Sequence, residues 1–471
     1  MMRIAMLGLC MALVAQASAN QLPAKVDSVV TAFKVPLNSF SVLVQEVGGA
    51  KPLVSVNAAA PRNPASTIKV LTTWLALEQL GPAWTWPTEA YLLGELKSGT
   101  LSGDLVLKGY GDPYLIRERL WAFQRDLKNR GLQQIDGNLI IDNSYFLDEY
   151  VDPAKFDGRG LRVYNVNPSA LLVNFQAIRF QFVPDPTAGR VDVIADPLPS
   201  NLQIDNRLKL RQGRCGGYQN GVAVSTDGSE SRDKIIFSGN YGANCDDFSL
   251  TRSALSAPAY AYGVFRALWE ESGGKLSGDW RLGAVADDAE PFATVESPPL
   301  SDVIEYVNKF SSNVMAQHLL LTLGAEQFGA PASREKGRSA VQTILQSKGL
   351  YFPELILDNG AGLSRDTRIS AASLAQVLLA ATASPWEAEF VSSLSLTGLD
   401  GTMRKKFRNG ELTGRMHLKS GRLRDVFAVA GYVHARSGKD FVVVVLQNYP
   451  DADRGAGEAI QNALFRWIYE Q

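Results

Sequence analysis

Ser66 and Lys69 combine a hydroxyl and an amine in a pattern that could carry nucleophilic chemistry. They belong to the sequence Ser66-Thr67-Ile68-Lys69 at the start of a predicted helix, where side chains three residues apart lie on one face. A serine hydroxyl is a poor nucleophile until a base takes its proton. Lysine is such a base only when it is neutral, so its ordinary pKa of about 10.4 must fall by roughly three units. By itself the pattern is more typical of an N-capping serine beside a solvated lysine.

Two later motifs could complete a site around this pair. Ser311-Ser312-Asn313 precedes a helical run, and polar triplets at that position are also common helix caps. Lys419-Ser420-Gly421 opens a predicted strand, where the glycine allows close approach to the backbone. An ordinary exposed strand end would look the same. Each motif is weak alone, but the three in this order favour a shared serine–lysine site.

Histidine chemistry and metal chemistry have little to be built from. The chain has three histidines and three cysteines, which leaves few ligands for a metal cluster. A Ser-His-Asp triad would need His318, His417 or His434. His417 lies two residues before Lys419, but a histidine on a strand is more often structural. We therefore expect no metal and no cofactor.

Composition places the chain among globular proteins with several domains. Its 471 residues are 46% hydrophobic and 20% charged, and a chain of this length folds into roughly two to four domains. Lysine and arginine number 47 and aspartate and glutamate 48, for a net charge of −1. This balance disfavours a nucleic-acid-binding protein, which needs a positive field.

The first nineteen residues have the features of an export signal. Arg3 precedes an apolar stretch from Ile4 to Ala15, and Ala17-Ser18-Ala19 is a small-residue cleavage site. We expect cleavage after Ala19 and a periplasmic mature protein without a transmembrane segment. Cys10, with Leu9 before it, is interpreted as part of the discarded peptide rather than as a lipid attachment site.

Two cysteines remain after cleavage, Cys215 and Cys245. An even pair in an exported protein usually forms a bridge, so we predict a disulfide between them. Two free buried thiols are the alternative.

The apolar pattern predicts the elements that must position the three motifs. Val42 to Val47 and Leu53 to Val56 form one hairpin, and a helix follows from Ser66 to Leu80. The pattern also predicts further helices and a second hairpin. The last helix is amphipathic, and we expect it to pack onto the two hairpins. The helices are Ala257 to Gly273, Ala371 to Ala381 (with Ser370 as N-cap) and Glu458 to Tyr469, and the hairpin joins Val426–Val433 to Asp440–Leu446. Helical periods also run from Leu300 to Leu323, where Ser311-Ser312-Asn313 precedes the helical run Val314 to Leu323.

The middle of the chain has a different character. From about Trp86 to Asp288, short strands and turns dominate, for example Asp104 to Lys108 and Leu139 to Asp142. Residues 184–250 hold both cysteines and look like a small separate β module.

The three motifs match, in order, the S-x-x-K, S-x-N and K-T/S-G set of penicillin-binding proteins and class A β-lactamases. The long gap between Ser66 and Ser311 and the lack of an E-x-x-L-N element in it depart from the β-lactamases. Over nearly its whole mature length the chain resembles the penicillin-binding-protein-4 type of D-alanyl-D-alanine carboxypeptidase/endopeptidase. The stretches that add to this resemblance are Pro64-Ala65-Ser66-Thr67, Gly109-Tyr110-Gly111-Asp112-Pro113, Ile141 to Phe146, Asp358 to Arg365 and Ala430-Gly431-Tyr432.

The resemblance implies an α/β (α+β) penicilloyl-serine-transferase fold. It has an antiparallel sheet flanked by helices, a helical region and two inserted, mainly β domains. The expected boundaries are 20–86 with 289–471 for the peptidase domain, 87–183 with 251–288 for the first insertion, and 184–250 for the nested one.

The resemblance also implies roles for the motif residues. Ser66 would be the acylated nucleophile and Lys69 its base, Ser311 would pass a proton to the leaving group, and Asn313 would hold the peptide backbone. Lys419, Ser420 and Gly421 would bind the substrate carboxylate end, and the backbone N–H groups of Ser66 and Arg422 would form the oxyanion hole. Asp142 and Arg365 would help to bind the stem peptide, with a turn-capping aspartate and a surface arginine as the alternatives.

Two positions depart from the family pattern. Ser420 stands where threonine is usual, which keeps the hydroxyl. Arg422 also stands where threonine is usual, and we expect its guanidinium to support carboxylate binding, unless the side chain turns out to solvent.

The functional hypothesis is therefore a periplasmic serine D,D-peptidase. It would act on the D-Ala-D-Ala ends and D-Ala cross-links of peptidoglycan, and β-lactams would inhibit it covalently. The alternatives are a β-lactamase or esterase of the same fold, or a weakly catalytic peptidoglycan-binding protein.

Overall fold

A computed structural model describes residues 20–212, 215, 221–228, 233–286 and 288–471. The predicted export signal, residues 1–19, lies outside the described residues. No helix in the described ranges has the length and the apolar character needed to cross a membrane.

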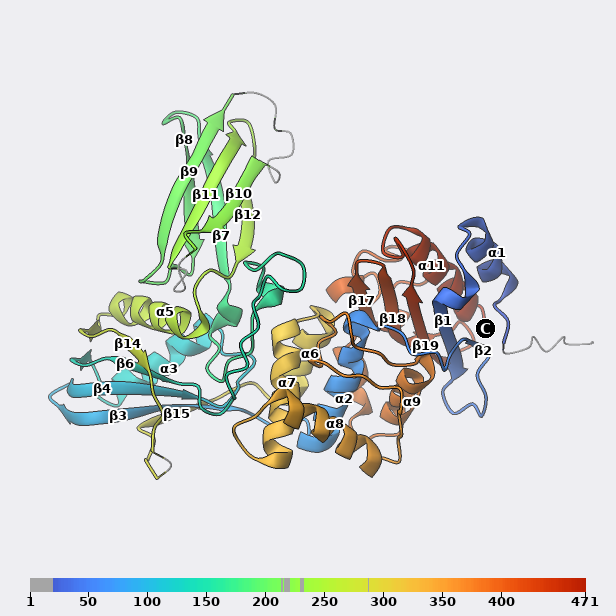
Figure 1. Cartoon of the computed structure of the whole chain (residues 1–471), viewed down its shortest axis with the longest axis horizontal. Coiled ribbons are helices and arrows are strands. Elements are labelled where there is room, and N and C mark those ends of the chain that lie inside the picture. Colours follow the sequence, from blue (N-terminus) through green and yellow to red (C-terminus); the bar gives the residue numbers. More distant parts are fainter. Residues whose placement is uncertain (1–19, 213–214, 216–220, 229–232, 287) are drawn as a thin grey trace, which may run out of the picture.

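One antiparallel sheet is built from the two ends of the chain. Its strand order is β16-β17-β18-β19-β1-β2, so the first predicted hairpin lies beside the second (Figure 1). Both hairpins are confirmed. The strands are β1 (Phe40–Glu46), β2 (Val54–Val56), β16 (Ser395–Leu396), β17 (Met416–Leu423), β18 (Val426–His434) and β19 (Asp440–Asn448).

Both faces of this sheet are covered by helices. Alternate residues of a strand point to opposite faces, so each strand contributes to two cores. In β19, Val442 and Val444 pack into the core under one helical layer, while Val443 and Val445 pack against the other. The thin layer consists of α1 (Ala24–Ala32) and α11 (Ala456–Tyr469). The thick layer consists of α2 (Lys69–Leu80), α6 (Leu300–Lys309), α7 (Asn313–Phe328), α8 (Arg334–Ser347), α9 (Ala371–Thr382) and α10 (Glu387–Ser393).

The predicted helical stretches are confirmed. α11 buries Ile460, Leu464 and Ile468 against the sheet, and Ser370 caps α9 by accepting a hydrogen bond from Ser373 N–H. The helical periods expected from Leu300 to Leu323 belong to two helices, α6 and α7. Ser312 caps α7 through Met315 N–H, so the helical run predicted after Ser311-Ser312-Asn313 is confirmed.

The first insertion is a sheet with a helical cover. Its strand order is β13-β5-β4-β3-β15, and β6 pairs with β4 and β14. One helix that covers the sheet, α3, was not predicted from the sequence. Leu120, Phe123 and Leu127 of α3 are buried at helical spacing, which is the pattern that could have revealed it. The elements are β3 (Pro87–Lys97), β4 (Thr100–Gly109), β5 (Gln134–Ile135), β6 (Leu139–Asp142), β13 (Lys275–Leu276), β14 (Trp280–Leu282), β15 (Ala293–Glu296), α3 (Arg117–Asn129) and α5 (Ala257–Glu271).

The nested module contains two small sheets, β10-β11-β9 and β12-β7-β8. It stands away from the large antiparallel sheet (Figure 1). The strands are β7 (Ile178–Asp185), β8 (Arg190–Asp196), β9 (Gln203–Arg211), β10 (Val222–Thr226), β11 (Lys234–Gly242) and β12 (Phe248–Arg252).

The strand bounds bear on the expected domain limits. β7 and β12 extend beyond 184–250, and β15 pairs with β3 although it lies after residue 288. We therefore propose residues 178–252 for the nested module and 87–296 for the insertion as a whole.

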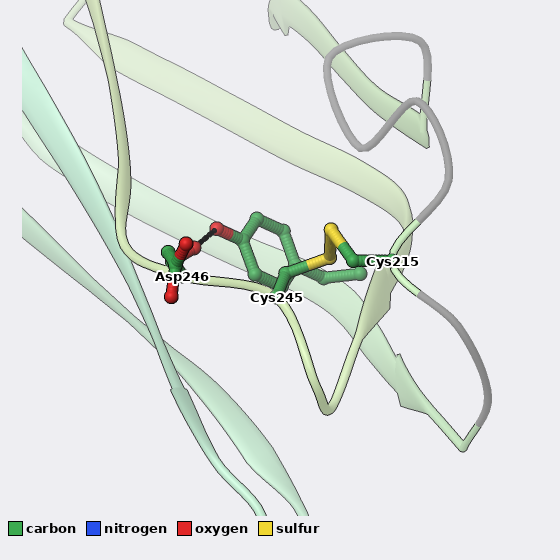
Figure 2. Close-up of a disulfide and its surroundings, with 4 residues drawn as sticks. Cys215, Cys245 and Asp246 are labelled. Atoms are coloured by element: carbon green, nitrogen blue, oxygen red, sulfur yellow. Dashed lines mark hydrogen bonds between the residues drawn. A yellow bond between two sulfur atoms is a disulfide. The ribbon is translucent and has the colours of Figure 1, made fainter.

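A disulfide joins Cys215 to Cys245 within this module, as the sequence predicts. Figure 2 shows the bridge beside a tyrosine whose hydroxyl donates to the backbone carbonyl of Asp246, which is the bond from Tyr241 at 2.7 Å. Cys245 itself is buried in the core of the insertion. The bridge therefore stabilises the module rather than the large sheet.

Replacing both cysteines by serine should lower the free energy of unfolding of the insertion by about 3–4 kcal/mol, because a loop of roughly 30 residues is no longer closed in the unfolded chain. Chemical denaturation followed by tryptophan fluorescence measures this change. Two free thiols in native protein that has never been reduced would contradict the prediction.

Candidate active site

Ser66 and Lys69 meet where a short 3-10 turn, Ala65–Ile68, runs into α2. Lys69 Nζ lies 3.0 Å from Ser66 Oγ. Lys69 is fully buried, while Ser66 remains partly accessible. The nucleophile can therefore be reached from solvent, and its amine partner is shielded from water.

Two further contacts hold the Lys69 amine. Its Nζ donates to Asn313 Oδ1 at 2.8 Å and to the carbonyl of Ala361. The second contact depends on Gly362, because a Cβ there would lie 1.9 Å from the carbonyl oxygen of Ala65, and its φ is +77°. Only glycine lets this loop pack against the turn that carries Ser66.

Ser311 and Lys419 form the second pair of the site. Lys419 Nζ donates to Ser311 Oγ at 2.9 Å and to the carbonyl of Ser420 at 2.9 Å. Ser311 has a φ of +60°, a conformation that costs a non-glycine residue about 1–3 kcal/mol and that is common at functional sites. The strain directs its hydroxyl between α6 and α7 toward the lysine.

The two lysines are both fully buried, and this sets their protonation. Burial is the larger cause that lowers the pKa of Lys69 well below its ordinary value, and the charge of Lys419 lowers it further. Burial alone lowers the pKa of Lys419 to about 7. No carboxylate pairs with either amine in the described part of the chain. The lowered pKa of Lys69 favours the neutral amine, which is the form that a general base requires.

Asn313 is held in one orientation. Its Oδ1 accepts from Lys69, and its Nδ2 donates to the carbonyl of Tyr164 at 3.0 Å. The amide nitrogen carries two hydrogens, so one remains for a substrate carbonyl. Tyr164 lies in the insertion, and no sequence motif indicated its part in the site.

The backbone of β17 passes directly over the nucleophile. A Cβ at Gly421 would lie 2.7 Å from the carbonyl oxygen of Pro64 and 3.0 Å from Ser66 N. Because of this close approach, the N–H of Ser66 lies beside the edge of β17 at the position where Arg422 follows Gly421. The sequence placed Lys419-Ser420-Gly421 at the opening of the second hairpin; in the structure it lies inside a separate strand, β17.

Ser420 has a hydroxyl neighbour that the sequence did not reveal. Its Oγ donates to Thr402 Oγ1 at 2.8 Å, and Thr402 is exposed in a 3-10 turn after Asp400. Two hydroxyls therefore lie side by side next to the Lys419 end of the site.

Arg422 turns away from these groups. Its Nη2 donates to the carbonyl of Asp453 at 2.6 Å, and its Nε lies 3.6 Å from the Asp453 carboxylate. The side chain is 64% exposed. The structure thus favours the alternative in which the guanidinium leaves the carboxylate end of the site.

The two residues expected to bind the stem peptide differ in solvent exposure. Asp142 is fully buried, and its carboxylate oxygens accept from the backbone of Ser144 and Val285, which favours a turn-capping role. Arg365 is exposed, donates to the carbonyl of Arg424 at 3.2 Å, and lies 4.9 Å from the ring of Phe156. Only Arg365 faces solvent beside the insertion.

The histidines do not take part in a triad. His318 is fully buried against the carbonyl of Gly111, and burial lowers its pKa to about 4. His434 pairs with Asp440, and burial lowers the pKa of His417. None of the three forms a hydrogen bond with Ser66 within the described residues. Nor do three His, Cys, Asp or Glu side chains gather there as a metal site would require.

Comparison with known proteins places this geometry in context. A model of the D-Ala-D-Ala carboxypeptidase 3 (S13) family matches residues 22–471. The D-alanyl-D-alanine carboxypeptidase DacB of Haemophilus influenzae is 25% identical over 400 residues, which are 83% of this chain and 81% of that protein. The D-alanyl-D-alanine carboxypeptidase of Actinomadura sp. (strain R39) is 28% identical over 414 residues, which are 84% and 76%.

The fold has a solved counterpart. The crystal structure of penicillin binding protein 4 (dacB) from H. influenzae superposes with a TM-score of 0.79 at 22% identity, covering 95% of this chain and 99% of that one. The same protein has been solved in complex with a β-lactam.

The lowered pKa of Lys69 predicts how acylation depends on pH. The reactive form is the neutral amine, so the rate of Ser66 acylation by a β-lactam should rise with pH through the Lys69 pKa. It should then reach a plateau well below pH 10.5, the ordinary value for lysine. Stopped-flow measurement of acylation across pH tests this. A rate that still climbs tenfold per pH unit between 8 and 10 would contradict a depressed pKa.

Proposed function

The chain belongs to the D-Ala-D-Ala carboxypeptidase 3 (S13) family and is a serine-type hydrolase, and from this we propose that it acts on peptidoglycan through an acyl-enzyme on Ser66. It removes the terminal D-Ala from stem peptides and opens cross-links made through D-Ala. The observation that carries the proposal is the series of contacts from Ser66 to Lys69 and from Lys69 to Asn313. Lys69 is buried, and its pKa is lowered well below the ordinary value.

Acylation follows from these contacts. Neutral Lys69 takes the hydroxyl proton while Ser66 Oγ attacks the carbonyl carbon of the penultimate D-Ala. The negative charge that develops on the carbonyl oxygen is stabilised by the N–H groups of Ser66 and Arg422, which pre-organised backbone can do without reorganisation. The free hydrogen of Asn313 Nδ2 holds the preceding peptide carbonyl.

Departure of D-Ala needs a proton on its nitrogen. Ser311 Oγ lies 2.9 Å from Lys419 Nζ, so the serine can donate its hydrogen to the leaving amine and regain one from the lysine. Before deacylation Lys69 releases to solvent the proton that it took from Ser66, and Lys419 regains one from solvent. Water then attacks the acyl-enzyme while neutral Lys69 takes a proton from it, and that proton returns to Ser66 Oγ as the acyl bond breaks. The products are a shortened peptide with a new carboxylate, and D-Ala or the released cross-link partner.

The carboxylate of the terminal D-Ala fits the other end of the site. Ser420 and Thr402 present adjacent hydroxyls there, close to the partly protonated Lys419. In a cross-link the same position is taken by a D-centre that also carries a carboxylate nearby. One recognition mode therefore serves both the carboxypeptidase and the endopeptidase reaction.

The rival functions lack support at this site. A β-lactamase that turns over rapidly needs a carboxylate to activate the deacylating water, as Glu does in class A enzymes. In the described residues no aspartate or glutamate forms a hydrogen bond with Ser66 or Lys69. A purely binding role would not require two buried amines beside a strained serine.

We also propose the cellular setting. An export signal over residues 1–19 and a disulfide in the nested module agree with a periplasmic enzyme. Its partners there are stem peptides as substrates and β-lactams as covalent inhibitors.

The direct test labels the protein with a fluorescent penicillin. The wild type should bind the label covalently and release D-Ala from a pentapeptide. Ser66→Ala should lose both activities because, among the described residues, Lys69 Nζ contacts no other hydroxyl. Ser312→Ala is the matched control, since that serine caps α7 without touching either lysine. Mass spectrometry that finds the adduct on another residue would overturn the assignment.

A second test concerns Arg422. Because its side chain is tied to Asp453, Arg422→Thr should leave kcat/KM for a pentapeptide and for a cross-linked dimer within about threefold of wild type, while the backbone N–H is kept. Steady-state kinetics on both substrates measures this. A fall of the order of tenfold, about 1.4 kcal/mol of transition-state binding, would mean that the guanidinium swings back onto the substrate carboxylate.

A further inference from the structure

Two arginines of the insertion, Arg162 and Arg252, form an arginine cluster on segments that lie beside the active site. A hydrogen bond from Ser253 N–H to the carbonyl of Leu161, at 3.0 Å, joins the segments that carry Arg162 and Arg252. The charge of Arg162 and burial, which is the larger cause, lower the pKa of Arg252 to about 10. The two guanidinium groups are therefore close enough to repel each other.

The cluster has no anionic partner of its own. In the part of the chain that the structure describes, none of its guanidinium groups forms an ion pair with a carboxylate. Asp157 is the acidic neighbour, and its oxygens accept from Tyr164 OH at 2.7 Å, from Asn165 Nδ2 at 2.9 Å and from the backbone of Arg159. Arg252 Nη1 donates to the carbonyl of Thr251 at 2.8 Å. Half-buried cations left without a counter-charge are costly unless a ligand supplies one.

The same loop touches the catalytic groups. Tyr164, two residues after Arg162, accepts the Nδ2 hydrogen bond of Asn313 at 3.0 Å. Phe156, at the start of the loop, lies against the guanidinium of Arg365. The arginine cluster is thus attached to the side of the cleft where Asn313 would hold the acyl half of the substrate, away from the Ser420 end.

The acyl half of a stem peptide carries carboxylates that are not part of the scissile bond. A D-glutamyl residue joined through its side chain leaves its α-carboxylate free, and a diamino-dicarboxylic residue carries another at the end of its side chain. Planar guanidinium groups bind carboxylates through paired, charge-assisted hydrogen bonds. We propose that Arg162 and Arg252 bind a free carboxylate of the stem peptide upstream of the scissile bond and so make the enzyme selective for the acid form over the amide form.

This inference rests on the proposed function, and the test separates the two. Pentapeptides ending in D-Ala-D-Ala are prepared with both upstream carboxylates free, with the glutamyl one as carboxamide, and with the side-chain one as carboxamide. The wild type should prefer the acid form in kcat/KM by tenfold or more over one of the two amides, which identifies the carboxylate. In Arg162→Ala/Arg252→Ala that preference should disappear, while the rate of penicillin acylation stays unchanged because penicillin lacks the stem.

Controls exclude a general loss of charge or of folding. Lys209→Ala removes an exposed cation from the nested module and should keep the wild-type preference. Arg162→Lys/Arg252→Lys should retain part of it. Calorimetric binding of the three peptides to Ser66→Ala gives the same comparison without turnover, so it decides the inference even if hydrolysis fails. An acid-to-amide ratio that is equal in the wild type and the double alanine variant, in turnover or in binding, would overturn the proposal.

Discussion

Two lysine amines buried within one active site are the constraint around which the protein is arranged. Lys69 and Lys419 are both fully buried and lack a carboxylate partner in the described residues. Burying an unpaired charge is strongly unfavourable, so burial lowers the pKa of both amines, that of Lys419 to about 7 and that of Lys69 well below its ordinary value. The fold thus produces a base at Ser66 without a histidine, and each nearby element serves to keep the amines dry and correctly oriented.

The surroundings of Lys69 show how that orientation is kept. Asn313 Oδ1 and the carbonyl of Ala361 accept hydrogen bonds from its amine. These neutral acceptors orient the hydrogens of the amine, and no anion among them stabilises the protonated form. The loop that supplies Ala361 can approach only because Gly362 has no side chain. Asn313 in turn is fixed by the carbonyl of Tyr164, which means that the inserted region contributes directly to the geometry of the catalytic centre.

Much of this arrangement could be predicted from the sequence. The hairpins and the capped helices follow from local periodicity, and the motifs at Ser66, Ser311 and Lys419 predicted which residues the fold brings together. Periodicity alone runs through both α6 and α7, and it is the polar triplet Ser311-Ser312-Asn313 that indicates the start of α7. α3 was missed because its apolar positions are set among many charged residues.

Contacts that depend on tertiary structure could not be predicted from the sequence. Tyr164 acts through its backbone carbonyl, which leaves no side-chain signal, and Thr402 is brought beside Ser420 by chain packing alone. Arg422 was expected at the carboxylate end, but Asp453 from a distant loop draws it away. The domain limits that we propose extend the expected ones because strand pairing, rather than a change in composition, groups β7, β12 and β15 with the insertion.

The protonation of Lys69 is the claim on which the mechanism depends, and it can be observed directly. NMR of protein labelled with 13C at lysine Cε, with Lys69 assigned by comparison with Lys69→Arg, follows the titration of this one amine. The midpoint should lie well below 10.5 in the wild type and should move upward in Lys419→Met, where the neighbouring positive charge is absent. A Lys69 that titrates near 10.5 in both proteins would contradict a neutral lysine as the base for Ser66.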